Sequence, residues 1–451
     1  MNDNELMKTM PVPQAVAKMA IPSIISSLVT VVYNMADTFF VGQTGDPLQV
    51  AAVSLTNPIF ILFMAFANMF GMGGSAAASI AMGENNKKRM KQVSAFITYA
   101  SLGVGIVFAA LLVLFMQPIL GIFGANAETY ALAKGYVFHI SYGAPFIIWS
   151  AAASFVVRSE GSSREAMIGS MIGTVANIVL DPIMISGLHM GAAGAAIATV
   201  SAQALSVIFA IILLIKKTLP FTITRHDFRF NTQCPKFLSI GLPLALQEFL
   251  TQLSFLALCA FVNRLGLEAS SGYGVACKIV NFAMLVPSAL MQSMASFVSQ
   301  NVGAGKVKRA RHTLFTGIGV GLCVGCIVFT LVLLKGDVMS GFFSTDAAVI
   351  QNSYDYLKGF ALESIVTAVL FSMIGYFNGN NQTLWVMTQG LIQTLLVRLP
   401  LAYFMSIQPD ASLTKIGLAA PVSTIVGIVL NIGYYIYWTR KQQHPPVEEI
   451  I

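Results

Sequence analysis

The chain has 451 residues, of which 56% are hydrophobic and only 10% are charged, whereas about 25% of the residues of an average soluble domain are charged. This composition excludes a soluble globular protein and indicates a polytopic membrane protein. The net charge of +7 is explained by Lys and Arg residues that gather in alternate loops, so we expect no nucleic-acid partner.

Apolar runs of about 20 residues, which is enough to cross a bilayer as a helix, recur along the whole chain. The predicted fold class is therefore an all-α polytopic membrane protein with twelve transmembrane helices. We predict these spans at residues 15–42, 50–82, 93–117, 131–157, 166–187, 193–215, 238–263, 272–300, 313–334, 349–376, 385–406 and 415–438.

The positions of the basic residues predict the orientation of the chain. Eighteen Lys and Arg residues lie in the loops after even-numbered spans and at the two chain ends. The opposite loops carry only Lys134, Arg264, Lys335 and Lys415. Since loops rich in basic residues remain on the cytoplasmic side of a membrane, we expect both termini to be cytoplasmic.

The two halves of the chain resemble each other, with an offset of about 220 residues. The turn Gly83–Arg89 after the second span is similar to Gly303–Arg309 after the eighth, and Pro22 in the first span matches Pro243 in the seventh. An even number of spans per copy gives parallel repeats related by an axis along the membrane normal, with the cargo cavity expected between them. The predicted divisions are an N-lobe (1–215), a cytoplasmic linker (216–236), a C-lobe (237–441) and a C-terminal tail (442–451).

An acidic residue, Asp37, lies near the outer end of the first span. It is about five residues from the loop that begins at Gly42, and so about 8 Å below the outer surface at 1.5 Å per residue. An ionisable residue inside a span is costly to insert, so its default interpretation is functional. Tyr33 and Asn34, within one turn of Asp37, are the polar groups that we expect to change partners when the site changes charge.

The fifth span carries a second acid, Asp181, four residues after Asn177, so both side chains share one helix face. Pro182 lacks an N–H group, so the carbonyl of Ile178 loses its helical partner near the same place. By the same arithmetic of helix rise, Asp181 and Thr199 of the sixth span each lie about 13 Å below the outer surface.

Asp37, Asn177, Asp181 and Thr199 offer oxygen ligands at similar depth, which suit a proton or a hard monovalent cation such as Na+. No cofactor beyond this coupling ion is expected. Both ions bind carboxylates, so the residues leave the choice between Na+ and H+ open. The alternative interpretation is a hydrogen-bonded plug that only holds the spans together, and it applies most to Thr199, because membrane threonines often bond their own helix.

Three polar residues of the second half are candidates for gating or for lining the cargo cavity. Gln247 and Glu248 lie in the seventh span and Glu363 lies in the tenth, where buried acids would attract cationic cargo. The acids have an equally weighted structural alternative, which is an ion pair with Lys278, Lys358 or Arg398.

The twelve spans, the two six-span lobes, the sequence Asn34–Asp37 and the motif Asn177–Pro182 resemble the multidrug and toxic compound extrusion (MATE) family over the whole chain. This resemblance implies a V-shaped transporter that exports amphipathic, often cationic, organic compounds in exchange for Na+ or H+. In the branch with an N-lobe cation site, the ligands match Asp37, Asn177, Asp181 and Thr199. Another branch carries an acidic pair in spans seven and ten, but Glu248 lies about one turn earlier than the glutamate of that branch.

We therefore expect a secondary active antiporter and not an enzyme. Its expected partners are small-molecule cargo and membrane lipids, and it is expected to act as a monomer in the plasma membrane of a bacterium or archaeon. The alternative function is a lipid or lipid-linked oligosaccharide flippase of a related fold, which would need a wide cationic cavity. The cations within the spans are few, namely Lys18, Lys278, Lys358 and Arg398, and acids lie in both lobes, which favours cationic cargo.

Overall fold

The computed structural model of the protein is helical over almost all of the chain that it describes. It describes residues 10–42, 46, 48–49, 52–53, 56–123, 125, 128–159, 162–215 and 234–443. Within these helices, the side chains of residues 33–39, 42, 57, 159, 213–215, 234–240, 252, 256 and 442–443 lie outside the description. The predicted linker at 216–236 and the predicted tail at 442–451 therefore lie largely outside the described residues.

The helices follow one another with short connections. The first half forms α2 (Val12–Gly42), α4 (Asn57–Gly83), α5 (Lys87–Leu114), α6 (Met116–Ile122), α7 (Tyr130–Ser159), α8 (Ser163–Pro182), η1 (Ile183–Gly187) and α9 (Gly191–Ile215). The second half forms α10 (Cys234–Asn263), α11 (Leu267–Gly303), α12 (Val307–Gly341), α13 (Ala347–Phe360), α14 (Glu363–Gly379), α15 (Thr383–Leu391), η3 (Ile392–Arg398), α16 (Leu399–Ser406), α17 (Leu413–Gly417) and α18 (Ala419–Gln443).

The predicted spans are confirmed as helices of the required length and composition. In the described part, 11 helices are long and apolar enough to cross a membrane, and α13 with α14 form a twelfth span that is bent by 49°. The prediction for the tenth span did not include this break. The second span differs at its start, because α4 begins at Asn57 and not at residue 50.

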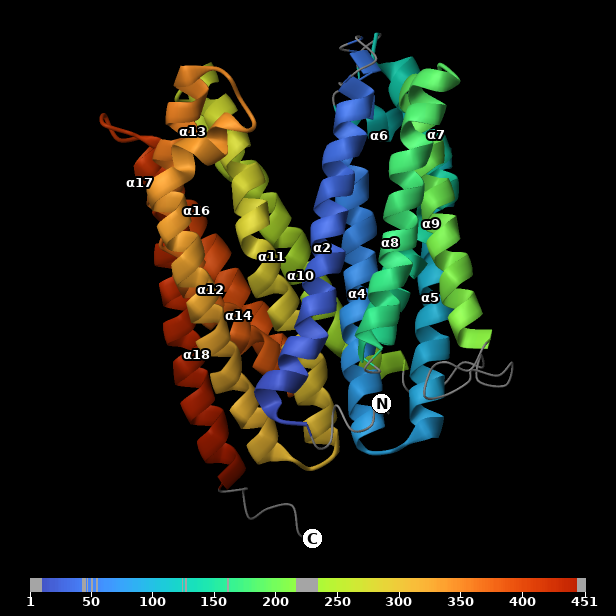
Figure 1. Cartoon of the computed structure of the whole chain (residues 1–451), viewed down its shortest axis with the longest axis vertical. Helices are drawn as coiled ribbons and strands as arrows, with labels where there is room; N and C mark the ends of the chain where they lie inside the picture. Colours follow the sequence, from blue (N-terminus) through green and yellow to red (C-terminus); the bar gives the residue numbers. More distant parts are fainter. Residues whose placement is uncertain are drawn as a thin grey trace. The chain divides into compact units, whose positions relative to one another are not determined.

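The chain divides into two compact units. Unit 1 comprises Met1–Phe249, Gln292–Thr313 and Asn378–Leu384, and unit 2 comprises Leu250–Met291, Leu314–Phe377 and Trp385–Ile451. In unit 1, α7 packs against α4, α5 and α9, while α8 packs against α2 and α9 (Figure 1). In unit 2, α13 packs against α17, and α18 packs against η3.

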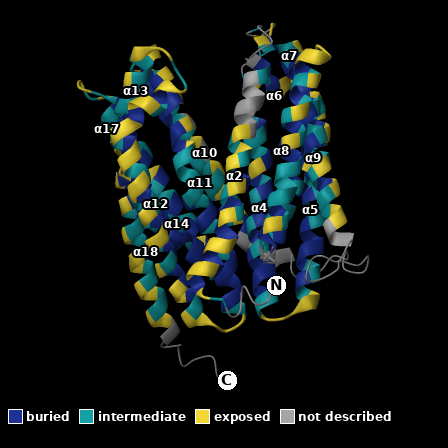
Figure 2. Ribbon diagram, viewed as in Figure 1, coloured by how far each residue is buried: buried dark blue, intermediate teal, exposed yellow. Residues whose placement is uncertain are grey.

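Burial follows the pattern expected of helices in lipid. Buried and exposed side chains alternate around each helix, so that one face is covered and the other is open (Figure 2). The open faces carry large apolar side chains, such as Leu114 with 75% and Ile122 with 81% of its surface exposed. Because lipid tails are as apolar as these side chains, the helices are held together by close packing and polar contacts.

The loops after α4 and α11 have the same backbone conformation at corresponding positions. Asn85 has a φ angle of 56° and Gly305 a φ angle of 73°, and Asn and Gly are the residues that adopt this left-handed region most readily. In the first of these loops, the side chain of Asn86 caps α5 by accepting a hydrogen bond from the Arg89 N–H at 3.0 Å. The repeat predicted from the two sequences is therefore also a repeat of conformation.

Two glycines of these repeated segments contact each other's helix. A Cβ atom at Gly83 would lie 2.2 Å from the carbonyl oxygen of Gln300, and one at Gly303 would lie 2.3 Å from the carbonyl oxygen of Ile80. Ile80 and Gln300 each stand three residues before the glycine of their own helix, so the contact is reciprocal. All four residues belong to unit 1. A reciprocal contact is what a pseudo-twofold axis between parallel repeats generates.

Prolines accompany a change of helix type in both halves. α8 ends at Pro182 and continues directly as the π-helix η1. Proline cannot donate the next helical hydrogen bond and its ring crowds the preceding turn, so the wider turn relieves both problems. In the second half, the π-helix η3 ends at Arg398, two residues before Pro400. In the first half, the wider turns thus begin at Ile183, two residues after Asp181.

Candidate functional site

Three of the four predicted ion ligands lie together in unit 1. Asn177 and Asp181 lie on α8 and Thr199 lies on α9, and these residues are 1%, 0% and 3% exposed. The Asn177 Nδ2 atom donates to Oδ1 of Asp181 at 3.3 Å and to the hydroxyl oxygen of Thr199 at 3.4 Å. Both hydrogen bonds are longer than usual, so the amide is held weakly in this orientation.

Small residues allow α8 and α9 to approach closely enough for this contact. A Cβ atom at Gly173 on α8 would lie 2.2 Å from the hydroxyl oxygen of Ser206 on α9. One at Gly194 on α9 would lie 2.7 Å from the carbonyl oxygen of Met184 on η1, which continues α8. The Ser206 hydroxyl donates to the carbonyl oxygen of Gly169 at 3.0 Å. Glycine at these positions thus sets the distance between the two helices that carry the ligands.

The fourth predicted ligand, Asp37, lies on α2 together with Tyr33 and Asn34. The side chains of these three residues lie outside the described residues. The helix α2 itself packs against α8, the helix of Asn177 and Asp181. The fold therefore brings the helix of Asp37 beside the other ligands.

The donor set has the chemistry of a site for a hard cation. The Asn177 Oδ1 atom is buried and has no hydrogen-bond partner among the described residues, which for a neutral polar atom costs about 1–3 kcal/mol. This amide oxygen, the Asp181 carboxylate and the Thr199 hydroxyl are all oxygen ligands of the kind that Na+ takes. The described residues contain no cluster of three or more His, Cys, Asp or Glu side chains that could hold a metal ion.

A second buried polar group lies in unit 2, around Glu363 on α14. Glu363 is 5% exposed, and its Oε1 accepts hydrogen bonds from the hydroxyls of Thr367 and Thr424, each at 2.8 Å. Gln393 on η3 donates to the Thr424 hydroxyl at 3.0 Å, and Gln389 on α15 donates to Gln393 at 2.6 Å. This chain of hydrogen bonds connects α14, α15, η3 and α18.

The structure answers the question of pairing that the sequence leaves open for Glu363. Among the described residues, Glu363 forms no ion pair: Lys358 pairs with Asp355 at 2.9 Å. Lys278 and Arg398 lie over aromatic rings, 5.6 and 5.1 Å from the ring centres. Two hydroxyl groups therefore hold the Glu363 carboxylate, and the charge of Arg398 acts on it without a direct ion pair.

The other two candidates from the second half of the sequence lie in unit 1. Gln247 and Glu248 are half-buried on α10, and each has interaction partners. Glu363 belongs to unit 2, so the two acids of the predicted C-lobe are assigned to different compact units.

Sequence reasoning did not identify Gln389, Gln393 or Thr424. The four-residue spacing of the two glutamines, which places them on one helix face, is the signal that was available in the sequence. Thr424 had no such signal, because its partners lie 31 and 61 residues away along the chain.

A comparison with known families finds two matches in this chain. A family model described as MatE matches residues 22–183 and again residues 243–404. The "Multidrug export protein MepA" of Staphylococcus aureus (strain MRSA252) is 27% identical over 394 residues, which cover 85% of this chain and 86% of that protein. The double match of the family model agrees with the repeat described above.

Solved structures with the same fold are also found. One is described as "Outward-facing conformation of a multidrug resistance MATE family transporter of the MOP superfamily"; it has a TM-score of 0.92 and 22% identity, and the match covers 98% of this chain and 99% of that one. Another, from Pyrococcus furiosus Vc1 (DSM3638), is described as a MOP superfamily transporter in which "reverse polarity of binding pocket suggests different function". It has a TM-score of 0.92 and 21% identity, with the same coverage. At this identity the two structures establish the fold alone.

Proposed function

The chain belongs to the MatE family and is thus a multidrug efflux transporter, and we propose that it works as a secondary active antiporter. In this proposal it exports amphipathic, cationic organic compounds in exchange for Na+ or H+. It lies in the plasma membrane as a monomer with both termini in the cytoplasm.

The observation that carries the proposal is the buried Asp181 carboxylate beside Asn177 and Thr199. A carboxylate at this depth is too costly to keep without a role or a partner. One of its partners, the Asn177 amide, is held by long hydrogen bonds and can rotate to present its oxygen in place of its nitrogen. When the site is empty, the amide donates a hydrogen bond to the free carboxylate. When a proton or Na+ is bound, the amide oxygen accepts a hydrogen bond from the protonated carboxyl group or binds the Na+ ion.

Coupling requires that the ion favours one conformation over another, since a ligand can shift an equilibrium only by its difference in affinity. We place the second acid, Asp37, in the same site, on the neighbouring helix α2. Binding of Na+ or a proton removes the repulsion between the two acids and draws or bends α2 toward α8. Tyr33 and Asn34 change partners in that movement, and the reshaped wall expels the cargo.

The test is efflux of a cationic dye from membrane vesicles energised by a Na+ gradient or by a pH gradient. We expect Asp181→Asn and Asp37→Asn to abolish coupled efflux at normal protein levels. Asp410→Asn is the matched control, because Asp410 is an exposed acid paired with Lys415 outside the spans, and it should export at the rate of the unmodified protein. Unaltered efflux in both site variants would disprove the assignment of the coupling site. The gradient that drives efflux identifies the ion.

A further inference from the structure

Unit 1 contains a pocket far along its helices from Asp181. It lies between α4, α7, α10, α11, α14 and α15, with about 420 Å³ of space that no atom fills and that includes open solvent. All the residues that line it belong to unit 1. Its polar lining consists of Ser75, Arg158, Gln292, Ser296, Asn378 and Thr383. None of the described residues that line it is acidic. Arg158 lies in the last turn of α7 and Thr383 begins α15, at the side of the membrane where the basic loops gather.

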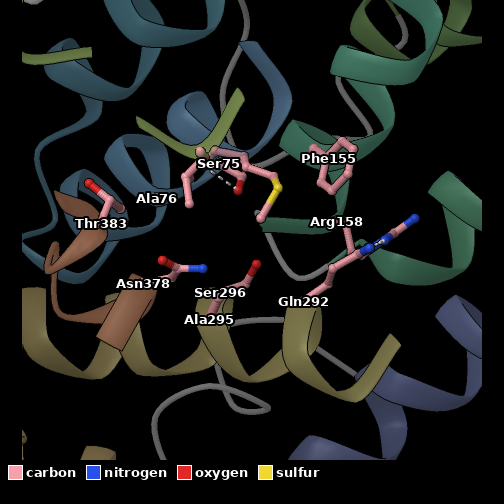
Figure 3. A pocket seen from close by; sticks show the side chains of 11 residues that line it. Ser75, Ala76, Phe155, Arg158, Gln292, Ala295, Ser296, Asn378 and Thr383 are labelled. Carbon is pink, nitrogen blue, oxygen red and sulfur yellow. Dashed lines mark hydrogen bonds between the residues drawn. The ribbon is translucent and has the colours of Figure 1, made fainter. Parts of the chain in front are cut away.

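Asn378 is the residue whose polar groups are least satisfied in this pocket. It is 4% exposed, and neither its amide nitrogen nor its amide oxygen has a hydrogen-bond partner among the described residues. Each of these two buried groups, left without a hydrogen bond, lowers the stability of the folded protein by about 1–3 kcal/mol. Asn378 and Ser296 project into the same space beneath Ser75 (Figure 3). A ligand or solvent is therefore needed to satisfy the amide.

Arg158 supplies the charge of the pocket. Its Nη1 donates to the Oε1 atom of Gln292 at 2.5 Å, and its guanidinium carbon lies 5.5 Å from the centre of the Phe155 ring (Figure 3). Its Nε is buried and has no partner among the described residues. The described residues provide no ion pair for this guanidinium, so a positive charge faces a pocket that is otherwise lined by neutral groups.

We propose that this pocket binds a small oxyanion, either a phosphate or a carboxylate group. A guanidinium offers parallel N–H donors that match the oxygens of such groups, and the hydrogen bonds are charge-assisted. The Asn378 amide and the Ser296 hydroxyl supply further donors on the opposite side. The bound group is either the head group of an anionic lipid or a free anion. This inference goes beyond the proposed export of cations, because the pocket selects the opposite charge.

The test measures the thermal unfolding midpoint of the full chain in a neutral detergent. Inorganic phosphate is added at constant ionic strength, with chloride as the reference anion. Phosphate should raise the midpoint of the unmodified protein, and Arg158→Gln should require about tenfold more phosphate for the same shift, as expected from the loss of one charge-assisted hydrogen bond. Arg164→Gln is the matched control, because Arg164 is an exposed basic residue of α8 outside the pocket, and its response should be unchanged.

A second variant keeps the proposal testable if Arg158→Gln does not fold. Asn378→Asp preserves the shape of the side chain and leaves Arg158 in place, but it sets a carboxylate where the anion would bind. It should abolish the response to phosphate, and it should raise the midpoint measured without phosphate, because Arg158 gains an internal partner. A response equal to that of the unmodified protein in both variants would overturn the proposal.

The source of the anion is resolved in lipid nanodiscs. Nanodiscs of phosphatidylcholine alone are compared with nanodiscs that also contain phosphatidylglycerol. Stabilisation by phosphatidylglycerol that Arg158→Gln removes supports a lipid head group, and stabilisation by free phosphate in phosphatidylcholine alone supports a soluble anion. If neither ligand stabilises the unmodified protein, the pocket holds no oxyanion and the proposal is wrong.

Discussion

At the scale of single residues, the amide of Asn177 is the group that makes the candidate ion site adjustable. A second carboxylate in its place could not donate to Asp181, and an apolar side chain could neither donate nor accept. The Oδ1 atom of Asn177 is buried and has no partner among the described residues, and in the proposed site it becomes a ligand when a cation binds.

We predict that Asn177→Leu weakens ion binding by about tenfold or more, because one oxygen ligand is lost and Asp181 loses one hydrogen-bond donor. The measurement is the concentration of Na+, or of protons, that half-saturates ion-driven stabilisation of the purified protein. Asn281→Leu, at an exposed position of α11, controls for the apolar substitution. If the two variants reach half-saturation at the same ion concentration, the Asn177 amide takes no part in ion binding.

Two hydroxyl groups hold Glu363, so its role as a hydrogen-bond acceptor and the role of its charge can be tested by two different substitutions. Glu363→Gln retains an oxygen that accepts from Thr367 and Thr424, whereas Glu363→Leu leaves both hydroxyls without that acceptor. We predict that the Leu variant loses about 1–3 kcal/mol of stability while the Gln variant changes by less than about 1 kcal/mol. Thermal unfolding in detergent checks both values.

The same pair of variants tests whether Glu363 shapes cargo preference. If its charge attracts cargo, Glu363→Gln should weaken the binding of a cationic dye more than that of a neutral dye of similar size. Equal losses for the two dyes would leave Glu363 with the structural role alone.

At the scale of helices, the reciprocal contact of Gly83 and Gly303 fixes how closely α4 and α11 approach in unit 1. Each glycine faces a backbone carbonyl of the other helix, which cannot rotate away as a side chain could. Any side chain at these positions must therefore move a helix.

We predict that Gly83→Ala and Gly303→Ala each destabilise the protein by about 1–3 kcal/mol, as overpacking of a close contact does. Gly103→Ala and Gly319→Ala are matched controls, since an added Cβ atom at either position meets no atom within 4 Å. These two control substitutions should leave the stability of the protein unchanged or raise it slightly, because alanine favours the helix more than glycine does. If the unfolding midpoints of the Gly83 and Gly303 variants equal those of the two controls, the contact between α4 and α11 is not rigid.

At the scale of the whole molecule, the two sites described here lie in the same compact unit but select opposite charges. In our proposals, the oxygen cluster of α8 and α9 binds a cation, and the pocket around Arg158 binds an anion. Because α8 also packs against α2, a change of charge at Asp181 can be transmitted to the helix that carries Asp37.

We predict that the distance between spin labels at Val32 on α2 and Val179 on α8 shortens when the site binds its ion. Both positions are exposed, so labels are tolerated. The native cysteines are first replaced, and distances are recorded at about pH 5 and about pH 8, with and without Na+. A label pair at Ile106 on α5 and Tyr142 on α7 should not respond. A distance between α2 and α8 that neither ion alters would move the coupling away from this site.

The sequence by itself determined the membrane class, the twelve spans, the repeat and the shared helix face of Asn177 and Asp181. These features depend on composition and on the helical period, which act over a few residues of one chain segment. Only the tertiary structure decided that Asn177 reaches Thr199, that hydroxyl groups hold Glu363, and that Arg158 and Asn378 line one pocket. These contacts join residues far apart in the chain, and they depend on the rotation and spacing of neighbouring helices. Packing at residues such as Gly173 and Gly83 sets that rotation and spacing. The helical period of the sequence does not predict either of them.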